Sequence, residues 1–182
     1  MIWGKLGTME ARGFLVADTL RNGTPVTFRA VRPDDEGRIA RAFAGLAPST
    51  VYTRFFGYRS ALTTRELAHI AEIDFVNEVM LVATFPGDAG EVIVGSGRYV
   101  AMGAGARTAE VAFTVEEDYQ GQGIASRLLQ HLAALARANG FTSLEAFVLA
   151  ENRPMLGVFA RSGLAMQQRR EEDALHVVLA LG

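Results

Sequence analysis

TAEVAFTVEEDYQGQGIAS, residues 108–126, is the stretch that decides the fold of this chain. Its first eight residues combine β-branched, aromatic and small apolar types, which is typical of a strand. After the glycines, apolar residues recur at helical spacing, at Ile124, Leu128, Leu132 and Leu135. The first N–H groups of a helix lack internal partners, and the helix dipole attracts anions. The loop with Gly121 and Gly123 therefore predicts a ligand that carries phosphate, and a glycine turn that merely starts a helix is the alternative.

Turn and capping residues on both sides of this stretch indicate where the other strands and helices begin and end. Asn22-Gly23 lies between two apolar runs and predicts a hairpin, and Pro48 is expected to close the first helix. Helical patterns begin at Pro33, Thr63, Gly123 and Asn152. The expected strands are 14–20, 26–32, 78–85, 91–100, 108–115, 142–149, 164–166 and 174–181. A strand–helix–strand unit requires a parallel pair, here 108–115 with 142–149. The predicted fold class is α+β, with a mixed, mostly antiparallel central sheet, one parallel strand pair and flanking helices.

Size and composition narrow the class of protein. A chain of 182 residues is most simply one domain, here 1–182, with residues 1–25 as an N-terminal extension and hairpin strand. The net charge of −2 favours neither nucleic acid nor a membrane as partner, and the lack of cysteine excludes thiolate chemistry. We expect no metal, because metal-ligand spacing is missing among the histidines His69, His131 and His176. No signal peptide or membrane span is evident, so a cytoplasmic protein is the default expectation.

Three features of the chain together resemble the GNAT superfamily of acyl-CoA-dependent N-acyltransferases. Gln120-x-x-Gly123-x-Ala125 follows a strand and opens a helix, which matches the Arg/Gln-x-x-Gly-x-Gly/Ala pattern of that family. Asn152 ends the next strand, and Glu110 lies within the strand that leads to the loop. The resemblance covers roughly residues 26–181 in element order.

The resemblance implies that acetyl-CoA is the cosubstrate and that its pyrophosphate binds the backbone amides of the loop. The pantetheine arm would lie along the strand before the loop, beside the next helix. The cofactor-binding residues implied in this way are Phe113, Thr114, Val115, Gln120, Gly121, Gln122, Gly123, Ile124, Ala125, Ser126, Asn152 and Phe159. Asn152 has a second interpretation as the N-cap of the helix through Pro154.

Glu110 is the residue implied as the general base. An amine is protonated at neutral pH, and an ammonium has no lone pair with which to attack a thioester. A carboxylate can accept that proton, directly or through water. The alternative interpretation of Glu110 is an exposed strand face or a structural ion pair.

Phe159 departs from the family pattern. GNAT enzymes often carry a tyrosine in this helix as the general acid for the leaving thiolate, and phenylalanine cannot donate a proton. The departure keeps open a non-catalytic acyl-CoA-binding or sensing module. A dinucleotide-binding enzyme is a further alternative, but Gly121-x-Gly123-x-x-Ser126 lacks the third glycine of that fingerprint.

A narrower resemblance concerns the acceptor. Residues 27–36 and 51–57 are similar to the GNAT domain of bacterial protein lysine acetyltransferases. It implies that the acceptor amine is a protein lysine, and a small-molecule amine is the alternative. The helices within residues 34–72 are expected to wall the acceptor site. A homodimer through the apolar C-terminal strand is also open.

Overall fold

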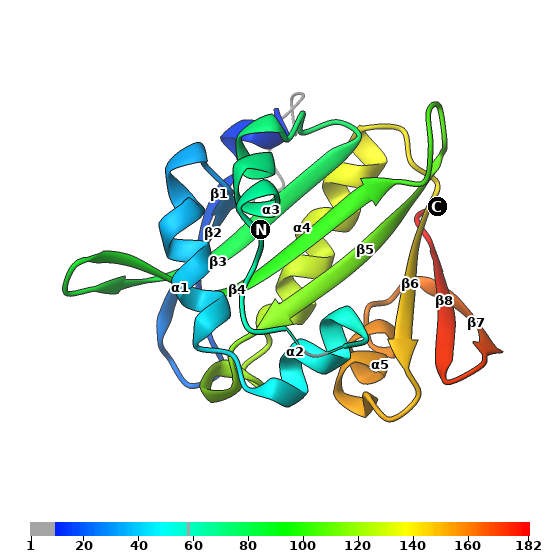
Figure 1. Ribbon diagram of the computed structural model, residues 1–182. Helices are drawn as coiled ribbons and strands as arrows, with labels where there is room; N and C mark the ends of the chain where they lie inside the picture. The colour runs from blue at the N-terminus through cyan, green and yellow to red at the C-terminus, as the bar shows by residue number, and fades with distance from the viewer. Residues whose placement is uncertain (1–9, 58) are drawn as a thin grey trace.

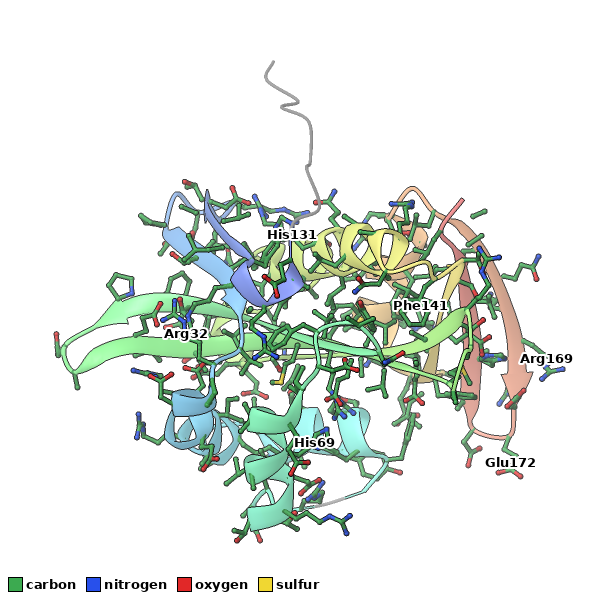
Figure 2. All side chains as sticks on the ribbon, turned by 90° about the horizontal axis from the view of Figure 1, so that it is seen from above. Arg32, His69, His131, Phe141, Arg169 and Glu172 are labelled. Atoms are coloured by element: carbon green, nitrogen blue, oxygen red, sulfur yellow. The ribbon has the colours of Figure 1, made fainter. Side chains whose placement is uncertain are left out.

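The computed structural model describes residues 10–57 and 59–182, and its strands form an eight-stranded sheet in the order β1-β2-β3-β4-β5-β6-β8-β7 (Figure 1). The strands are β1 Leu15–Thr19, β2 Pro25–Ala30, β3 Glu78–Gly87, β4 Gly90–Ala101, β5 Thr108–Val115, β6 Ser143–Leu149, β7 Ala165–Glu171 and β8 Ala174–Ala180. The α-helices are α1 Glu36–Ala44, α2 Pro48–Phe55, α3 Thr64–His69, α4 Ile124–Ala138 and α5 Arg153–Ala160. Helices α4 and α5 cover one face of the sheet, and α1, α2 and α3 cover the other (Figure 1, Figure 2).

The predicted parallel pair is confirmed as β5 with β6, and the other neighbouring strands are antiparallel. The parallel register lasts for three residue pairs and ends at Glu110 opposite Glu145. Beyond this point β6 turns away, while β5 continues to Val115 with no strand partner on that side among the described residues (Figure 1). The sheet is therefore splayed next to the glycine loop.

The core lies between the sheet and α4. The apolar stripe predicted for this helix is buried, with Leu128 and Leu132 fully inaccessible to solvent. Phe28 and Leu81 meet it from the strands with no exposed surface. The loop at the start of α4 is thus attached to the most deeply packed helix of the molecule, which holds its backbone in place.

The structure departs from the expected elements in two ways. Helix α1 ends at Ala44, before Pro48 as expected, but Pro48 also occupies the first turn of an additional helix, α2, where the missing N–H of proline costs nothing. The apolar C-terminal strand β8 lies between β6 and β7, so both of its sides are paired within the chain. It cannot pair across a dimer, and the outer edge is the polar strand β7 instead.

A buried ion network holds the start of α1. Arg29 on β2 donates to both carboxylate oxygens of Asp35 at 2.7 and 2.9 Å, and the two residues are 1% and 0% exposed. Burial alone would raise the pKa of Asp35, but hydrogen bonds from Arg29 and from the Arg32 backbone outweigh it and lower the pKa below 3.8. The network fixes α1, which forms part of the face around the second pocket described below.

No helix within residues 10–57 and 59–182 is long and apolar enough to cross a membrane.

Candidate active site

A cleft of about 440 Å³ opens where β5 and β6 separate. Its walls come from β5, the glycine loop, the first turn of α4, and helices α2 and α5. It brings together all the predicted site residues except Gln122, namely Glu110, Phe113, Thr114, Val115, Gln120, Gly121, Gly123, Ile124, Ala125, Ser126, Asn152 and Phe159. Residues that are far apart in sequence therefore share one continuous surface.

The loop has the backbone geometry that the glycines predict. Gly121 and Gly123 adopt φ values of +74° and +92°, which other residues rarely adopt. Among the described residues no side chain caps α4, so its first N–H groups remain available to an anion in the cleft. A Cβ placed on Gly121 would meet nothing within 4 Å, so the backbone there faces open space.

Gln120 anchors this loop from behind. Its Nε2 donates to the carbonyl oxygen of Val115 at 3.0 Å and lies 3.4 Å from the hydroxyl of Thr50 on α2. The side chain thereby ties the loop to both walls of the cleft, and the loop residues that follow it line the cleft.

Glu110 lies on the α2 side of β5, in the middle of the sheet, with its side chain exposed to the cleft. Within residues 10–57 and 59–182 it makes no hydrogen bond and no ion pair. A structural ion pair, the alternative interpretation of this carboxylate, is therefore absent from the described part of the chain. The carboxylate oxygens are free to accept protons or hydrogen bonds from a ligand.

Asn152 and Phe159 hold α5 against the cleft. The side-chain oxygen of Asn152 accepts a hydrogen bond from the backbone N–H of Met155 at 3.3 Å, as an N-cap residue does. Phe159 is 1% exposed, and its ring centroid lies 6.2 Å from that of Phe113. Phe159 is therefore a buried packing residue of this wall.

Three arginines of the cleft, Arg21, Arg54 and Arg161, were missed from the sequence. Arg21, in the hairpin between β1 and β2, reaches the carbonyl oxygen of Gly121 at 3.5 Å and lies beside the loop. Arg54, on α2, lines the middle of the cleft. Burial lowers the pKa of Arg54, and the positive charge of Arg98 lowers it further, while Glu110 acts in the opposite direction. Only the folded chain brings these cations to the site, because no local motif marks them.

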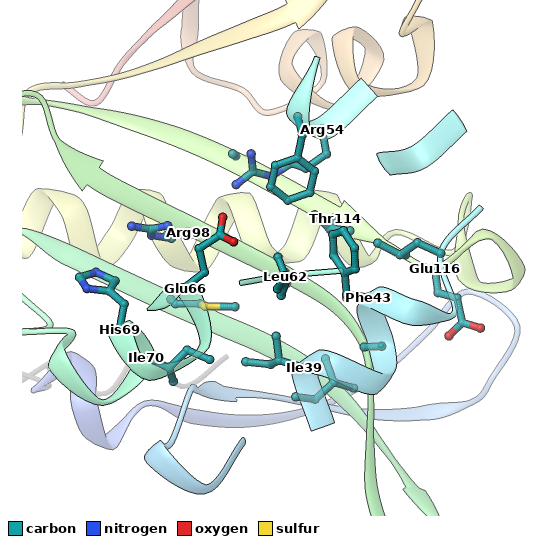
Figure 3. A pocket seen from close by; sticks show the side chains of 18 of the residues that line it. Ile39, Phe43, Arg54, Leu62, Glu66, His69, Ile70, Arg98, Thr114 and Glu116 are labelled. Carbon is teal, nitrogen blue, oxygen red and sulfur yellow. The ribbon is translucent and has the colours of Figure 1, made fainter. Parts of the chain in front are cut away.

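A second, smaller pocket of about 150 Å³ lies between α1, α3 and the sheet (Figure 3). It shares Arg54, Ala112 and Thr114 with the cleft, so the two spaces adjoin. Glu78 lies in the wall of this pocket. Its Oε2 accepts a hydrogen bond from Nε2 of His69 at 2.8 Å, and its Oε1 forms an ion pair with Nε of Arg98 at 2.6 Å. The pocket lies under the N-terminal helices, within the segment expected to wall the acceptor site.

A protein-family model described as the acetyltransferase (GNAT) family matches residues 51–164. The chain belongs to the GNAT acetyltransferase family. The matched GNAT segment contains Glu110, the whole glycine loop, Asn152 and Phe159. The predicted family is confirmed, and so is the GNAT-like fold class.

Individual GNAT proteins are similar over most of the chain. The acetyltransferase PA5475 of Pseudomonas aeruginosa is 30% identical over 161 residues, which cover 88% of this chain and 86% of that protein. The GNAT domain of PAT from S. lividans is 31% identical with a TM-score of 0.83, covering 91% of this chain and 96% of that domain. The structure of yncA from Salmonella typhimurium, solved with its cofactor acetyl-CoA, shares the fold at 20% identity and a TM-score of 0.70, covering 86% of this chain and 94% of its own.

Proposed function

We propose that this GNAT protein transfers an acetyl group from acetyl-CoA to a primary amine. The observation that carries the proposal is that an uncapped helix N-terminus and an unpaired carboxylate line the same cleft. The first suits a phosphate group, and the second suits an ammonium. One ligand of each kind placed in the cleft would meet where β5 and β6 separate.

The cosubstrate side of the cleft fits acetyl-CoA. The free amides of Ile124, Ala125 and Ser126 at the start of α4 would bind the pyrophosphate, with Arg21 beside them. The unpaired side of β5, from Val111 to Val115, offers main-chain groups to the pantetheine amides, as an added strand would. The acetyl-CoA bound to yncA, which shares the fold, supports this choice of cosubstrate.

The acceptor side of the cleft contains the base. Glu110 takes a proton from the acceptor ammonium, which frees the lone pair that forms the new N–C bond. Backbone N–H groups along the unpaired side of β5 stabilise the oxyanion that develops on the carbonyl oxygen. Because Phe159 cannot protonate the leaving thiolate, we assign catalysis mainly to Glu110 and to this backbone.

Two acceptor classes agree with a primary amine. Similarity to the GNAT domain of PAT supports a protein lysine, the acceptor implied by residues 27–36 and 51–57. A mostly apolar pocket beside Arg54, which is unpaired among the described residues, supports a small-molecule amine. A non-catalytic acyl-CoA sensor is the remaining candidate, and the observation that favours it is the buried Phe159.

The test compares the melting temperature of the protein with and without acetyl-CoA, CoA and NAD, and then measures CoA release with amine acceptors. A ligand that binds only the folded state raises the melting temperature. We expect a rise with acetyl-CoA and none with NAD, followed by transfer to an amine. A rise without transfer to any amine would establish the sensor, and no rise at saturating acetyl-CoA would refute the proposed function.

A further inference from the structure

Arg54 has a charge that the proposed acetyl transfer does not use. Its guanidinium lies over the Phe55 ring at 4.8 Å, and it makes no hydrogen bond or ion pair within residues 10–57 and 59–182. Its side chain is partly buried, and the nearby Arg98 repels it. A partly buried cation beside a like charge is costly unless an anion compensates it. The position of Arg54 therefore calls for an anionic group supplied by a ligand.

Glu110 is the counterpart of Arg54 across the cleft. Each is unpaired among the described residues, and both line the same space. The carboxylate acts on Arg54 electrostatically, yet its oxygens lie too far from the guanidinium to form an ion pair with it. A ligand that carries an ammonium and a carboxylate on one carbon atom would bridge this gap. Arginine binds carboxylates through two parallel hydrogen bonds, which suits it to this task.

The second pocket adds an apolar requirement. Its wall is mostly hydrophobic and includes Ile39, Phe43, Leu62, Ile70 and Met80 (Figure 3). A cavity of about 150 Å³ holds one group of the size of benzene.

The charged groups around this pocket do not call for a second charged ligand. Glu66 pairs with Arg59, and Glu78 pairs with both His69 and Arg98. Glu116 has no ion pair among the described residues, but its carboxylate points away from the apolar side chains (Figure 3). The pocket adjoins the cleft at Arg54. A single ligand can therefore place an apolar group in the pocket and its two charged groups at Glu110 and Arg54.

We propose that the acceptor is a free α-amino acid with an apolar side chain of the size of leucine, methionine or phenylalanine. Its ammonium lies at Glu110, its carboxylate at Arg54, and its side chain in the second pocket. A protein lysine would leave Arg54 unpaired and the pocket unfilled. This inference rests on the proposed acetyl transfer and names its acceptor.

The reaction balances without a further reactant. Glu110 takes one proton from the ammonium, the nitrogen bonds to the acetyl carbon, and the C–S bond breaks. The nitrogen then loses a second proton, which ends on the thiolate sulfur of CoA, and Glu110 releases its proton to water. The products are the N-acetyl amino acid and CoA.

The test is a set of matched acceptors assayed with the whole protein and acetyl-CoA. Leucine, leucinamide and alanine differ by one feature each, and a lysine peptide represents the other class. We expect kcat/KM for leucine to exceed that for leucinamide by about 10- to 100-fold, because leucinamide lacks the carboxylate. We expect it to exceed that for alanine by about tenfold or more, because alanine leaves the pocket empty.

Arg54→Gln tests the assigned partner of the carboxylate. We expect the ratio of leucine to leucinamide kcat/KM to fall to about one, with the acetyl-CoA melting shift retained. Arg54→Lys keeps the charge without the planar fork and should give an intermediate ratio. Arg65→Gln, at an exposed position on α3, is the matched control and should leave the wild-type ratio unchanged.

Several outcomes would overturn the inference. Equal turnover of leucine and leucinamide by the wild-type protein removes the carboxylate requirement, even if no Arg54 variant folds. Loss of the acetyl-CoA shift in Arg54→Gln assigns this side chain to the phosphates of the cosubstrate. Transfer to the lysine peptide but to no amino acid would leave the proposed function standing and refute this inference. Absence of both binding and transfer would refute the proposed function itself.

Discussion

Glu110 lies exposed on β5, at the last residue pair before β5 and β6 separate. Changing Glu110 to Gln keeps the shape of the side chain and removes its ability to take a proton. We expect kcat to fall by on the order of 10²- to 10⁴-fold, the range of general base catalysis, with the acetyl-CoA melting shift preserved. Steady-state kinetics of CoA release measure the effect. Unchanged turnover in Glu110→Gln would show that another group removes the proton.

Asp35 is a structural residue with a large expected effect. Asp35→Ala leaves the buried guanidinium of Arg29 with Glu91 as its remaining carboxylate partner, at 2.9 Å. We expect a loss of about 3 kcal/mol in the free energy of unfolding, at the lower end for a broken buried pair. Asp34→Ala, next to it and exposed, is the control and should cost less than about 1 kcal/mol. Urea unfolding of the two variants compares them, and equal losses would contradict the account of the network.

At the residue scale, the sequence predicts well where a role depends on a local motif. The loop glycines and the N-cap at Asn152 follow from turn and capping chemistry, and both are found with the expected geometry. Arg54 is different, because nothing near it in sequence indicates that it ends unpaired opposite Glu110. The role of a charged side chain can be inferred only when its neighbours in the folded structure are known.

The junction between the glycine loop and α4 is the element on which cosubstrate binding depends. Gly123→Ala places a Cβ at φ +92°, a conformation that costs an L-residue about 1–2 kcal/mol. The new atom would also lie 2.6 Å from the end of the Arg127 side chain, which can move. We expect a lower melting temperature and an acetyl-CoA dissociation constant raised roughly tenfold. Calorimetric titration measures the affinity.

Gly13→Ala provides the matched control for this junction. Gly13 has an ordinary φ, and a Cβ there would meet nothing within 4 Å. We expect no change in acetyl-CoA affinity. If both alanine variants bind as the wild type does, the loop geometry is not needed for the ligand.

At the element scale, strongly periodic segments were predicted and short ones were not. The apolar stripe predicted for α4 matches the observed helix, Ile124–Ala138. Helix α2 was hidden because Pro48 signals both the end of one helix and the start of another, and eight residues are too few for a clear period. This short helix carries Arg54, so the missed element and the missed residue have one cause.

The whole molecule is expected to lose stability in acid. Six described carboxylates have a lowered pKa in the folded state, and they are Asp18, Asp35, Glu66, Asp74, Glu91 and Glu117. Hydrogen bonds from Arg59 and Thr63 lower the pKa of Glu66 to about 2. A lowered carboxyl pKa stabilises the fold above the unfolded value near pH 4, and this contribution is lost as the pH falls toward the folded value.

Two histidines modify this dependence near neutrality in opposite directions. Burial lowers the pKa of His131, so its contribution to the stability of the folded state declines as the pH falls below 6.5. The hydrogen bond with Glu78 raises the pKa of His69, so its contribution declines as the pH rises through the raised value. We expect a melting temperature that changes little between pH 6 and 7 and falls steeply below about pH 4.5. Calorimetry from pH 7 to pH 3 tests this, and a flat curve below pH 5 would contradict it.

At the scale of the whole molecule, the topology of the sheet could be predicted from the sequence, but the contacts between residues far apart in the chain could not. A strand–helix–strand unit almost always makes a right-handed connection between two parallel strands, so the parallel pairing of β5 with β6 could be predicted. The sequence left the partner of the C-terminal strand open, because an apolar strand is equally suited to the interior of a sheet or to a partner chain. Which of the two applies depends on the placement of β7, whose polar composition marks the outer edge.

Because the parallel register between β5 and β6 is short, we expect the strands on its two sides to open independently of each other. Three residue pairs join the block of β1 to β5 to the block of β6, β8 and β7. Local opening follows the boundaries of such cooperative units, so the amides of β6 should exchange with deuterium sooner than those of β3 and β4. An occupied cleft would bridge the two blocks and slow this exchange. Hydrogen exchange of β6 would therefore report occupancy of the cleft even in a variant that no longer turns over.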